Sequence, residues 1–186
     1  TGLDIYKDNK FPPHFVHIKS KAENACKFLK KDINFIMSQS ALEHIQSDFD
    51  VINEITRELV RNKNPFIQIH MVPASHSLWL YLWHGWRQYS KKNLSFFAEK
   101  LSHNFSLNIS LIPIGSKNTF WSHFHNITLP YYTNKKIREE GWYSQKGVMQ
   151  NIFKSVLLDL NCDTEKMNSF WAFTISSKSV ELKFRN

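Results

Sequence analysis

The chain has 186 residues, 42% of them apolar and 15% aromatic, so its length suits one domain and its composition excludes wholesale disorder. Its formal net charge of +8 arises between Leu59 and Arg138, where ten Lys and Arg residues accompany a single acid, Glu99. Five glycines, without a G-x-G-x-x-G or P-loop pattern, exclude the usual nucleotide-phosphate cradles, and no apolar run approaches the ~18 residues of a membrane span.

The first part of the chain, about residues 20–61, is predicted to be a helical scaffold. Apolar side chains at helical spacing predict one helix over Ala22–Met37. Ser40, with Glu43 three residues later, is typical of a capping box and predicts a second helix that runs to about Arg61.

The middle part, residues 62–142, is predicted to be a basic β/α region rich in His and Trp. The run Asn62-Lys-Asn-Pro ends the helical pattern. Helices between strands are typical of a βαβ unit. The elements expected here are strands at Phe66–Val72, Leu107–Ile114 and Trp121–Leu129, and helices at His76–Tyr89 and from Asn93 or Ser95 to Leu101.

The last part, residues 143–186, is predicted to be a helix followed by a hairpin. Apolar spacing indicates the helix over Gly147–Leu158, and two alternating strands, Phe170–Ile175 and Val180–Phe184, flank the turn sequence Ser176–Ser179. We therefore predict an α/β (or α+β) fold in a single globular domain, 1–186, with a central mixed sheet, flanking helices and a C-terminal β-hairpin.

The two cysteines, Cys26 and Cys162, do not form a disulfide framework, and the polar stretch Thr1–Lys10 does not resemble a signal peptide. These features predict a cytoplasmic or nuclear protein. No Cys-x-x-Cys or His-Glu-x-x-His spacing supports zinc, although three histidines of the middle part could bind it. No cofactor is expected, and no membrane partner.

The sharpest local pattern is His123-Phe-His125. On a strand, residues two apart share a face, so both imidazoles could meet one phosphate, and His70 on a neighbouring strand could join them. Imidazoles titrate near neutral pH, which suits a general acid and base or a nucleophile. This pattern predicts a metal-independent phosphodiesterase or ribonuclease. The alternative is that these histidines make ordinary structural hydrogen bonds.

One family resemblance extends this hypothesis. A strand, a helix and a strand followed by Phe124-His125-Asn126 and a later Gly141-Trp142 faintly resemble half of a phospholipase D-like unit. In that family a histidine attacks phosphorus, so the resemblance implies His125 as the nucleophile. The family's His-x-Lys pairing is missing because position 127 is Ile, and the chain is not assigned to the family.

Basic residues mixed with aromatic ones favour nucleic acid, because cations hold phosphates while bases stack on rings. We therefore predict foremost a nucleic-acid-binding domain, with RNA or single strands preferred because no helix-turn-helix or zinc-finger pattern occurs. The alternative is an ordinary solvated basic face. The predicted contacts are Arg61, Lys63, Arg87, Lys91, Lys92, Lys117, Lys135, Lys136 and Arg138 for phosphates, and Trp121, Tyr131 and Tyr132 for bases.

A third hypothesis rests on Trp79, Trp83 and Trp86, which follow i, i+4, i+7 and would form one aromatic stripe on a helix. Such a stripe is either part of the core or a surface for a protein partner or a second copy of the chain. In the latter case the protein is an interaction module and its basic charge is incidental.

Overall fold

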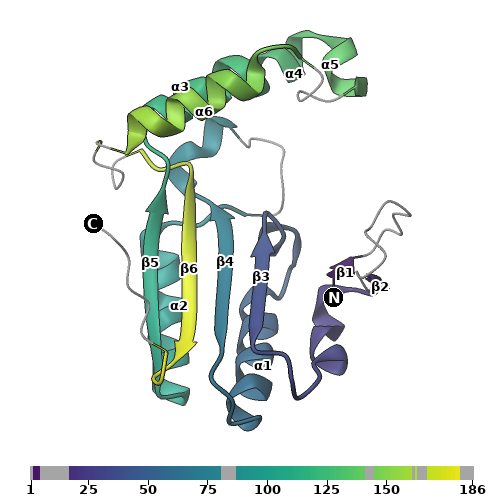
Figure 1. The fold of residues 1–186 in the computed structure, drawn as a ribbon, viewed down its shortest axis with the longest axis vertical. Helices are drawn as coiled ribbons and strands as arrows, with labels where there is room; N and C mark the ends of the chain where they lie inside the picture. The colour runs from purple at the N-terminus through teal and green to yellow at the C-terminus, as the bar shows by residue number, and fades with distance from the viewer. Residues whose placement is uncertain are drawn as a thin grey trace.

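The protein has the predicted α/β fold, built on a four-stranded mixed sheet. The computed structural model describes residues 2–4, 17–80, 87–140, 145–160, 162 and 167–180, and the statements below concern those residues. Across the sheet the order is β3 (Phe35–Gln39), β4 (Ile67–Pro73), β6 (Phe170–Ser177) and β5 (Leu107–Ile114). Figure 1 shows these four strands standing side by side.

Two helices cover one face of this sheet. α1 (Asp48–Arg61) connects β3 to β4, and α2 (Lys91–Asn104) connects β4 to β5, and both lie behind the sheet in Figure 1. α1 buries a stripe of apolar side chains at helical spacing because this face meets the strands. The stripe consists of Val51, Ile52, Ile55 and Leu59, which join Phe66, Val72, Phe173 and Ile175 in the core.

The strand β6 gives the sheet its mixed character. β3 and β4 are parallel, whereas β6 runs antiparallel to both β4 and β5. β4 and β5 are therefore parallel to each other, with β6 inserted between them. In this register Thr174 lies opposite both Ile69 and Ser110. The interior of β6 is buried on both faces, as expected for a central strand rich in aromatic and β-branched residues.

A layer of helices lies across one end of the sheet (Figure 1). It consists of α3 (Lys117–His123), the π-helix η4 (Phe124–Thr128), α4 (Leu129–Thr133), α5 (Lys135–Glu140) and α6 (Val148–Asp159). Short elements complete the described fold: the strands β1 (Gly2–Asp4) and β2 (His17–Lys19) and the 3-10 helices η1 (Ala22–Phe28), η2 (Leu42–His44) and η3 (Ser75–Leu80). None of the described helices is long and apolar enough to cross a membrane.

The predicted helix over Ala22–Met37 is wrong in its second half. Only Ala22–Phe28 is helical, in the 3-10 form, and Phe35–Gln39 is the edge strand β3. Alternation between exposed and half-buried side chains in Phe35–Gln39 has the period of a strand, and parallel pairing with β4 outweighs the local helical spacing. The second predicted helix begins later, because α1 has Ser47 at its N-cap instead of Ser40.

The predicted strand over Trp121–Leu129 is also wrong, because this segment is helical throughout. The strands predicted at Phe66–Val72 and Leu107–Ile114 and the helix over Gly147–Leu158 are confirmed to within a residue or two. Of the predicted hairpin, the first strand is β6, and its predicted partner lies outside the described residues beyond Val180. Of the predicted helix His76–Tyr89, residues 81–86 lie outside the described residues, and η3 covers its start.

Candidate functional site at the carboxyl edge of the sheet

The carboxyl ends of the three parallel strands β3, β4 and β5 meet at one edge of the sheet, beneath the helical layer (Figure 1). Open α/β sheets bind their ligands outside this edge, because connecting loops and helix N-termini gather there. We call this region the carboxyl edge. It comprises residues 40–48, 74–77, 87–90, 115–119 and 168–171.

The loop after β3 brings a buried carboxyl to this edge. Ser40 adopts a positive φ of 47°, rare for a residue other than glycine, and its N–H donates to the Met71 carbonyl at 3.0 Å. The sharp turn leads into η2, where Glu43 is fully buried. Burial raises the pKa of the Glu43 carboxyl, and a hydrogen bond with Ser40 opposes that rise.

A second carboxylate, Asp48, begins α1 and is held by two residues distant in sequence. The Tyr89 hydroxyl donates to Asp48 Oδ2 at 2.5 Å, and Arg87 pairs with Asp48 Oδ1 at 3.0 Å. Burial and the hydrogen bond to Asp48 raise the pKa of Tyr89 far above its usual value, so this phenol stays protonated. The Tyr89 N–H donates to the Pro73 carbonyl, which fastens this cluster to the end of β4.

The start of β6 contributes three buried polar side chains with unused hydrogen-bonding atoms. Asn168 Oδ1, Ser169 Oγ and Trp171 Nε1 have no hydrogen-bond partner in the part of the chain that the structure describes, although each residue is at most 3% exposed. Folded proteins seldom leave such atoms unpaired, and the exceptions mark places where water or a ligand completes the pairing. Three in four consecutive residues form the strongest sign of a binding site in the described fold.

Hydrogen bonds fix the position of this trio between the ends of β4 and β5. The Ser169 N–H donates to the Ile114 carbonyl at 3.0 Å, and the Ala74 N–H donates to the Ser169 carbonyl at 3.0 Å. The Ser77 hydroxyl donates to the Asn168 carbonyl at 2.8 Å. The His76 ring lies edge-on to the Trp171 ring, with centroids 6.4 Å apart.

One carboxylate, Asp159 at the end of α6, ties the helical layer to the carboxyl edge. It accepts hydrogen bonds from the backbone N–H groups of Ser116, Asn118 and Thr119 at 2.7, 3.1 and 2.8 Å, and from the Asn118 and Thr119 side chains. The backbone donors belong to the start of α3, where an α-helix supplies no carbonyl partner of its own for the first N–H groups. Burial alone would raise the pKa of Asp159, but the hydrogen bonds outweigh it and lower the pKa.

The three predicted catalytic histidines do not come together. His70 is in the core beneath α1, where its Nδ1 lies 2.8 Å from Ser38 Oγ and its Nε2 lies 3.3 Å from Gln68 Oε1. Burial lowers the pKa of His70 to about 4. Because His123 and His125 are on a helical segment, they point about 200° apart around its axis and do not share a face.

The same two histidines differ in their surroundings. His123 Nδ1 lies 3.0 Å from Thr128 Oγ1, and burial lowers the pKa of His123 to about 4. His125 is exposed and stacks on Trp121 at 5.8 Å. It borders a shallow groove of about 260 Å³ between the helices α3 and α6. Within the described residues, no three His, Cys, Asp or Glu side chains form a cluster that could hold a metal ion.

The predicted phosphate contacts do not form one surface. Arg61 and Lys63 lie where α1 ends, at the amino end of β4, whereas Lys117 follows the carboxyl end of β5. The strands between these ends are about 20 Å long. The remaining described members lie on several elements toward the other end from Arg61: Lys91 and Lys92 begin α2, Lys135 and Lys136 begin α5, Arg87 pairs with Asp48, and of Arg138 only the backbone, in α5, is described.

The predicted aromatic contacts lie on the helical layer. Trp121, Tyr131 and Tyr132 are each 43–51% exposed, on α3 and α4. Trp83 and Trp86 lie outside the described residues, and of Trp79 only the backbone, in η3, is described. The proposed tryptophan stripe therefore stays a prediction.

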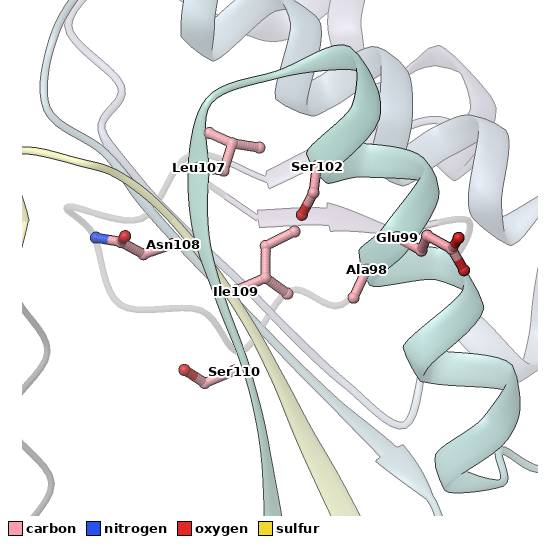
Figure 2. A pocket seen from close by; sticks show the side chains of 7 residues that line it. All are labelled: Ala98, Glu99, Ser102, Leu107, Asn108, Ile109 and Ser110. Carbon is pink, nitrogen blue, oxygen red and sulfur yellow. The ribbon is translucent and has the colours of Figure 1, made fainter.

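A larger hollow, of about 630 Å³, lies away from the carboxyl edge, between α2 and the first half of β5. In Figure 2, Ile109 points toward α2, whereas Asn108 and Ser110 point away from the helix. Glu99 also points away from the strand (Figure 2). Polar groups do not converge here as they do in ligand sites, so the carboxyl edge is the better candidate.

No protein-family model and no curated protein matches this chain. Among solved structures, its fold is similar to that in the crystal structure of the plantazolicin methyltransferase BamL in complex with a triazolic desmethylPZN analog and SAH. The two chains are 12% identical and superpose with a TM-score of 0.50. The match covers 87% of this chain and 59% of BamL, so the chain spans less than two thirds of that protein's length.

This similarity contradicts two of the functions predicted from the sequence. The predictions of a nucleic-acid-binding domain and of a phosphodiesterase or ribonuclease are wrong, because the chain has a fold that is similar to that of a methyltransferase. The interaction module stays a prediction, because Trp83 and Trp86 lie outside the described residues. The prediction of nucleic acid gave too much weight to net charge, which describes a whole chain and not the arrangement of its side chains. The positions of Arg61 and Lys117 at opposite ends of the sheet illustrate the difference.

Proposed function

We propose that this chain carries a methyltransferase active site at the carboxyl edge and binds S-adenosylmethionine there. The observation that carries this proposal is the trio Asn168, Ser169 and Trp171, whose unpaired polar atoms lie at the edge where open α/β sheets bind ligands. The likeness in fold to a methyltransferase whose structure contains SAH supports the choice of ligand.

The residues at this edge suit such a ligand chemically. S-adenosylmethionine contains no phosphate, so the scarcity of glycine and the lack of a phosphate cradle do not count against it. Its hydroxyl, amino and ring-nitrogen groups pair with donors and acceptors such as Trp171 Nε1 and Asn168 Oδ1. When bound, this cofactor supplies a methyl group carried on a positively charged sulfur.

The chain's own carboxyls and phenol would have different roles. Because its pKa is raised, Glu43 exchanges a proton closer to neutral pH than an ordinary glutamate does, which suits it to hydrogen-bond the ligand or take a proton from the methyl acceptor. Tyr89 stays protonated and holds Asp48, so it serves to position the loops. A cytoplasmic or nuclear location accords with this proposal, in which Cys26 and Cys162 are free thiols.

The test is binding of SAH, measured by calorimetry and by the shift in melting temperature. At 100 times its dissociation constant, SAH should stabilise the protein by about 2.7 kcal/mol. For a chain of this size that corresponds to a rise in Tm of about 5–10 °C. No heat of binding and no shift at millimolar SAH, with a folded protein, would refute the proposal.

A matched pair of serine variants tests the location of the site. Ser169→Ala removes a buried hydroxyl without a partner, so the free protein should be at least as stable as the wild type while SAH binds about tenfold more weakly. Ser77→Ala removes a hydroxyl that already has a partner, so it should lose about 1 kcal/mol of stability. Equal SAH affinity of Ser169→Ala and the wild type would remove Ser169 from the site.

A further inference from the structure

The helix α6 exposes a continuous apolar stripe on the side that faces away from the rest of the fold. Four of its members are spaced by four, three and four residues, and the fifth directly follows the third of them. This spacing places all five within about 100° of the helix circumference. They are Met149, Phe153, Val156, Leu157 and Leu160, with exposed fractions of 57, 64, 42, 49 and 74%.

The stripe is separate from the other faces of α6. The buried residues Val148, Ser155 and Asp159 face the rest of the fold, and Asp159 caps α3. Asn151, Lys154 and Leu158 line the groove beside Trp121 on a third side. The helix therefore does not need the stripe for its own packing, and the stripe contains no charged residue that would oppose burial in an interface.

We propose that this stripe is the interface of a homodimer in which α6 packs antiparallel against α6 of a second copy. The spacing is self-complementary about a point between Lys154 and Ser155. In an antiparallel pair, Met149 lies opposite Leu160 of the second copy, and Phe153 lies opposite Val156. A twofold interface requires this property, because the same patch must fit itself.

The exposed area agrees with this interface. With about 200 Å² for each fully exposed large side chain, the stripe offers about 570 Å² in each copy. Two copies would bury about 1,100 Å², just above the roughly 1,000 Å² that a biological interface should exceed. An apolar patch of this size on a monomer marks an interaction surface. The proposal does not depend on the methyltransferase proposal, because the stripe is on a different side of α6 from the Asp159 carboxylate that caps α3.

The first test is the molar mass of the full chain in solution, measured by light scattering and sedimentation. Because a small interface implies weak association, the protein concentration is varied from about 5 to about 200 µM. The wild type should approach twice the 22.0 kDa of one chain. Phe153→Glu should be monomeric throughout, because it would bury a charge at the centre of the stripe. Leu158→Glu is the matched control, since Leu158 is 54% exposed on the same helix but off the stripe, and it should dimerise as the wild type does.

The second test fixes the direction of packing and does not depend on a disruptive variant. In a chain with Cys26 and Cys162 replaced by serine, Met149→Cys mixed with Leu160→Cys should form the crosslinked dimer on oxidation, and Met149→Cys alone should not. The two copies of position 149 would lie about 16 Å apart along the helices, too far for a disulfide. A wild type that is monomeric at 200 µM, a dimer that persists in Phe153→Glu, or efficient crosslinking of Met149→Cys alone would overturn the proposal.

Discussion

Replacing Asp159 with alanine should weaken the contact between α6 and the start of α3 more than any other single substitution in α6. The carboxylate accepts hydrogen bonds from three backbone N–H groups and from the side chains of Asn118 and Thr119. Loss of an N-cap costs about 0.5–2 kcal/mol, and hydrogen bonds to a charged group contribute about 1.5–3 kcal/mol. With partial replacement by water, we expect a loss of about 2–4 kcal/mol.

The loss should also depend on pH. The folded-state pKa of Asp159 is lowered. The carboxylate's contribution to the free energy of unfolding is therefore fully present above the ordinary aspartate pKa, and it is lost as the pH falls through the folded-state pKa. Thermal unfolding followed by circular dichroism should show Asp159→Ala melting about 5–15 °C below the wild type at pH 7. The difference should narrow below pH 3.5, a range set by the ordinary aspartate pKa of about 3.9.

The control for this experiment is Asp32→Ala, which removes an exposed carboxylate in the turn before β3. It should change Tm by no more than about 2 °C, because exposed groups contribute within about 0.5 kcal/mol. If Asp159→Ala melted within 2 °C of the wild type at pH 7, the capping argument would be refuted. A difference that stayed constant down to pH 2 would contradict the role of the charge.

Two further predictions concern the core and the turns. Burial lowers the pKa of His70 to about 4, below the ordinary value of 6.5, so the stability that neutral His70 provides is present above pH 6.5 and is lost as the pH falls through about 4. Chemical unfolding measures the free energy of unfolding at pH 7 and at pH 4.5. In His70→Gln the difference between these two values should be about 2–3 kcal/mol smaller than in the wild type, and an unchanged difference would contradict the burial of this ring. Lys63 has a φ of 59°, so Lys63→Gly should raise the free energy of unfolding by about 0.5–1 kcal/mol, whereas Lys21→Gly, at an ordinary φ of −71°, should lower or not change it.

The elements with long apolar patterns could be predicted from the sequence. β4 alternates between half-buried and buried side chains, and the first half of β5 alternates between half-buried and exposed ones. The buried residues of α6 recur at helical spacing, whereas β6 is a continuous buried run. The α/β class followed from helices placed between strands. The edge strand β3 was missed because Phe35 and Met37 are more than half exposed, and a strand with a single partner leaves little mark on the local pattern.

The site was harder to predict because its parts are distant in sequence. Asp48 meets Tyr89 across 41 residues, and the Ala74 N–H donates to the Ser169 carbonyl between two strands that are not adjacent in the chain. The unpaired atoms of Asn168 and Trp171 are detectable only once burial is known. The pattern His123-Phe-His125 gave a wrong prediction, because two residues two apart share a face only on a strand and this segment is helical. The one signal in the sequence was Asn168-Ser169, two polar residues directly before a strongly apolar strand.

The insertion of β6 between β4 and β5 also has a consequence for synthesis on the ribosome. In the described sheet β5 pairs with β6 and with no other strand, and β6 comes more than 55 residues after β5 ends. Until that strand is made, β5 has no partner and β4 presents an open edge, both of them apolar and prone to pair with other chains. The sheet therefore closes late, in a step of long loop closure, and folding should be slow. A chaperone that shields β4 and β5 during this interval would raise the yield of native protein.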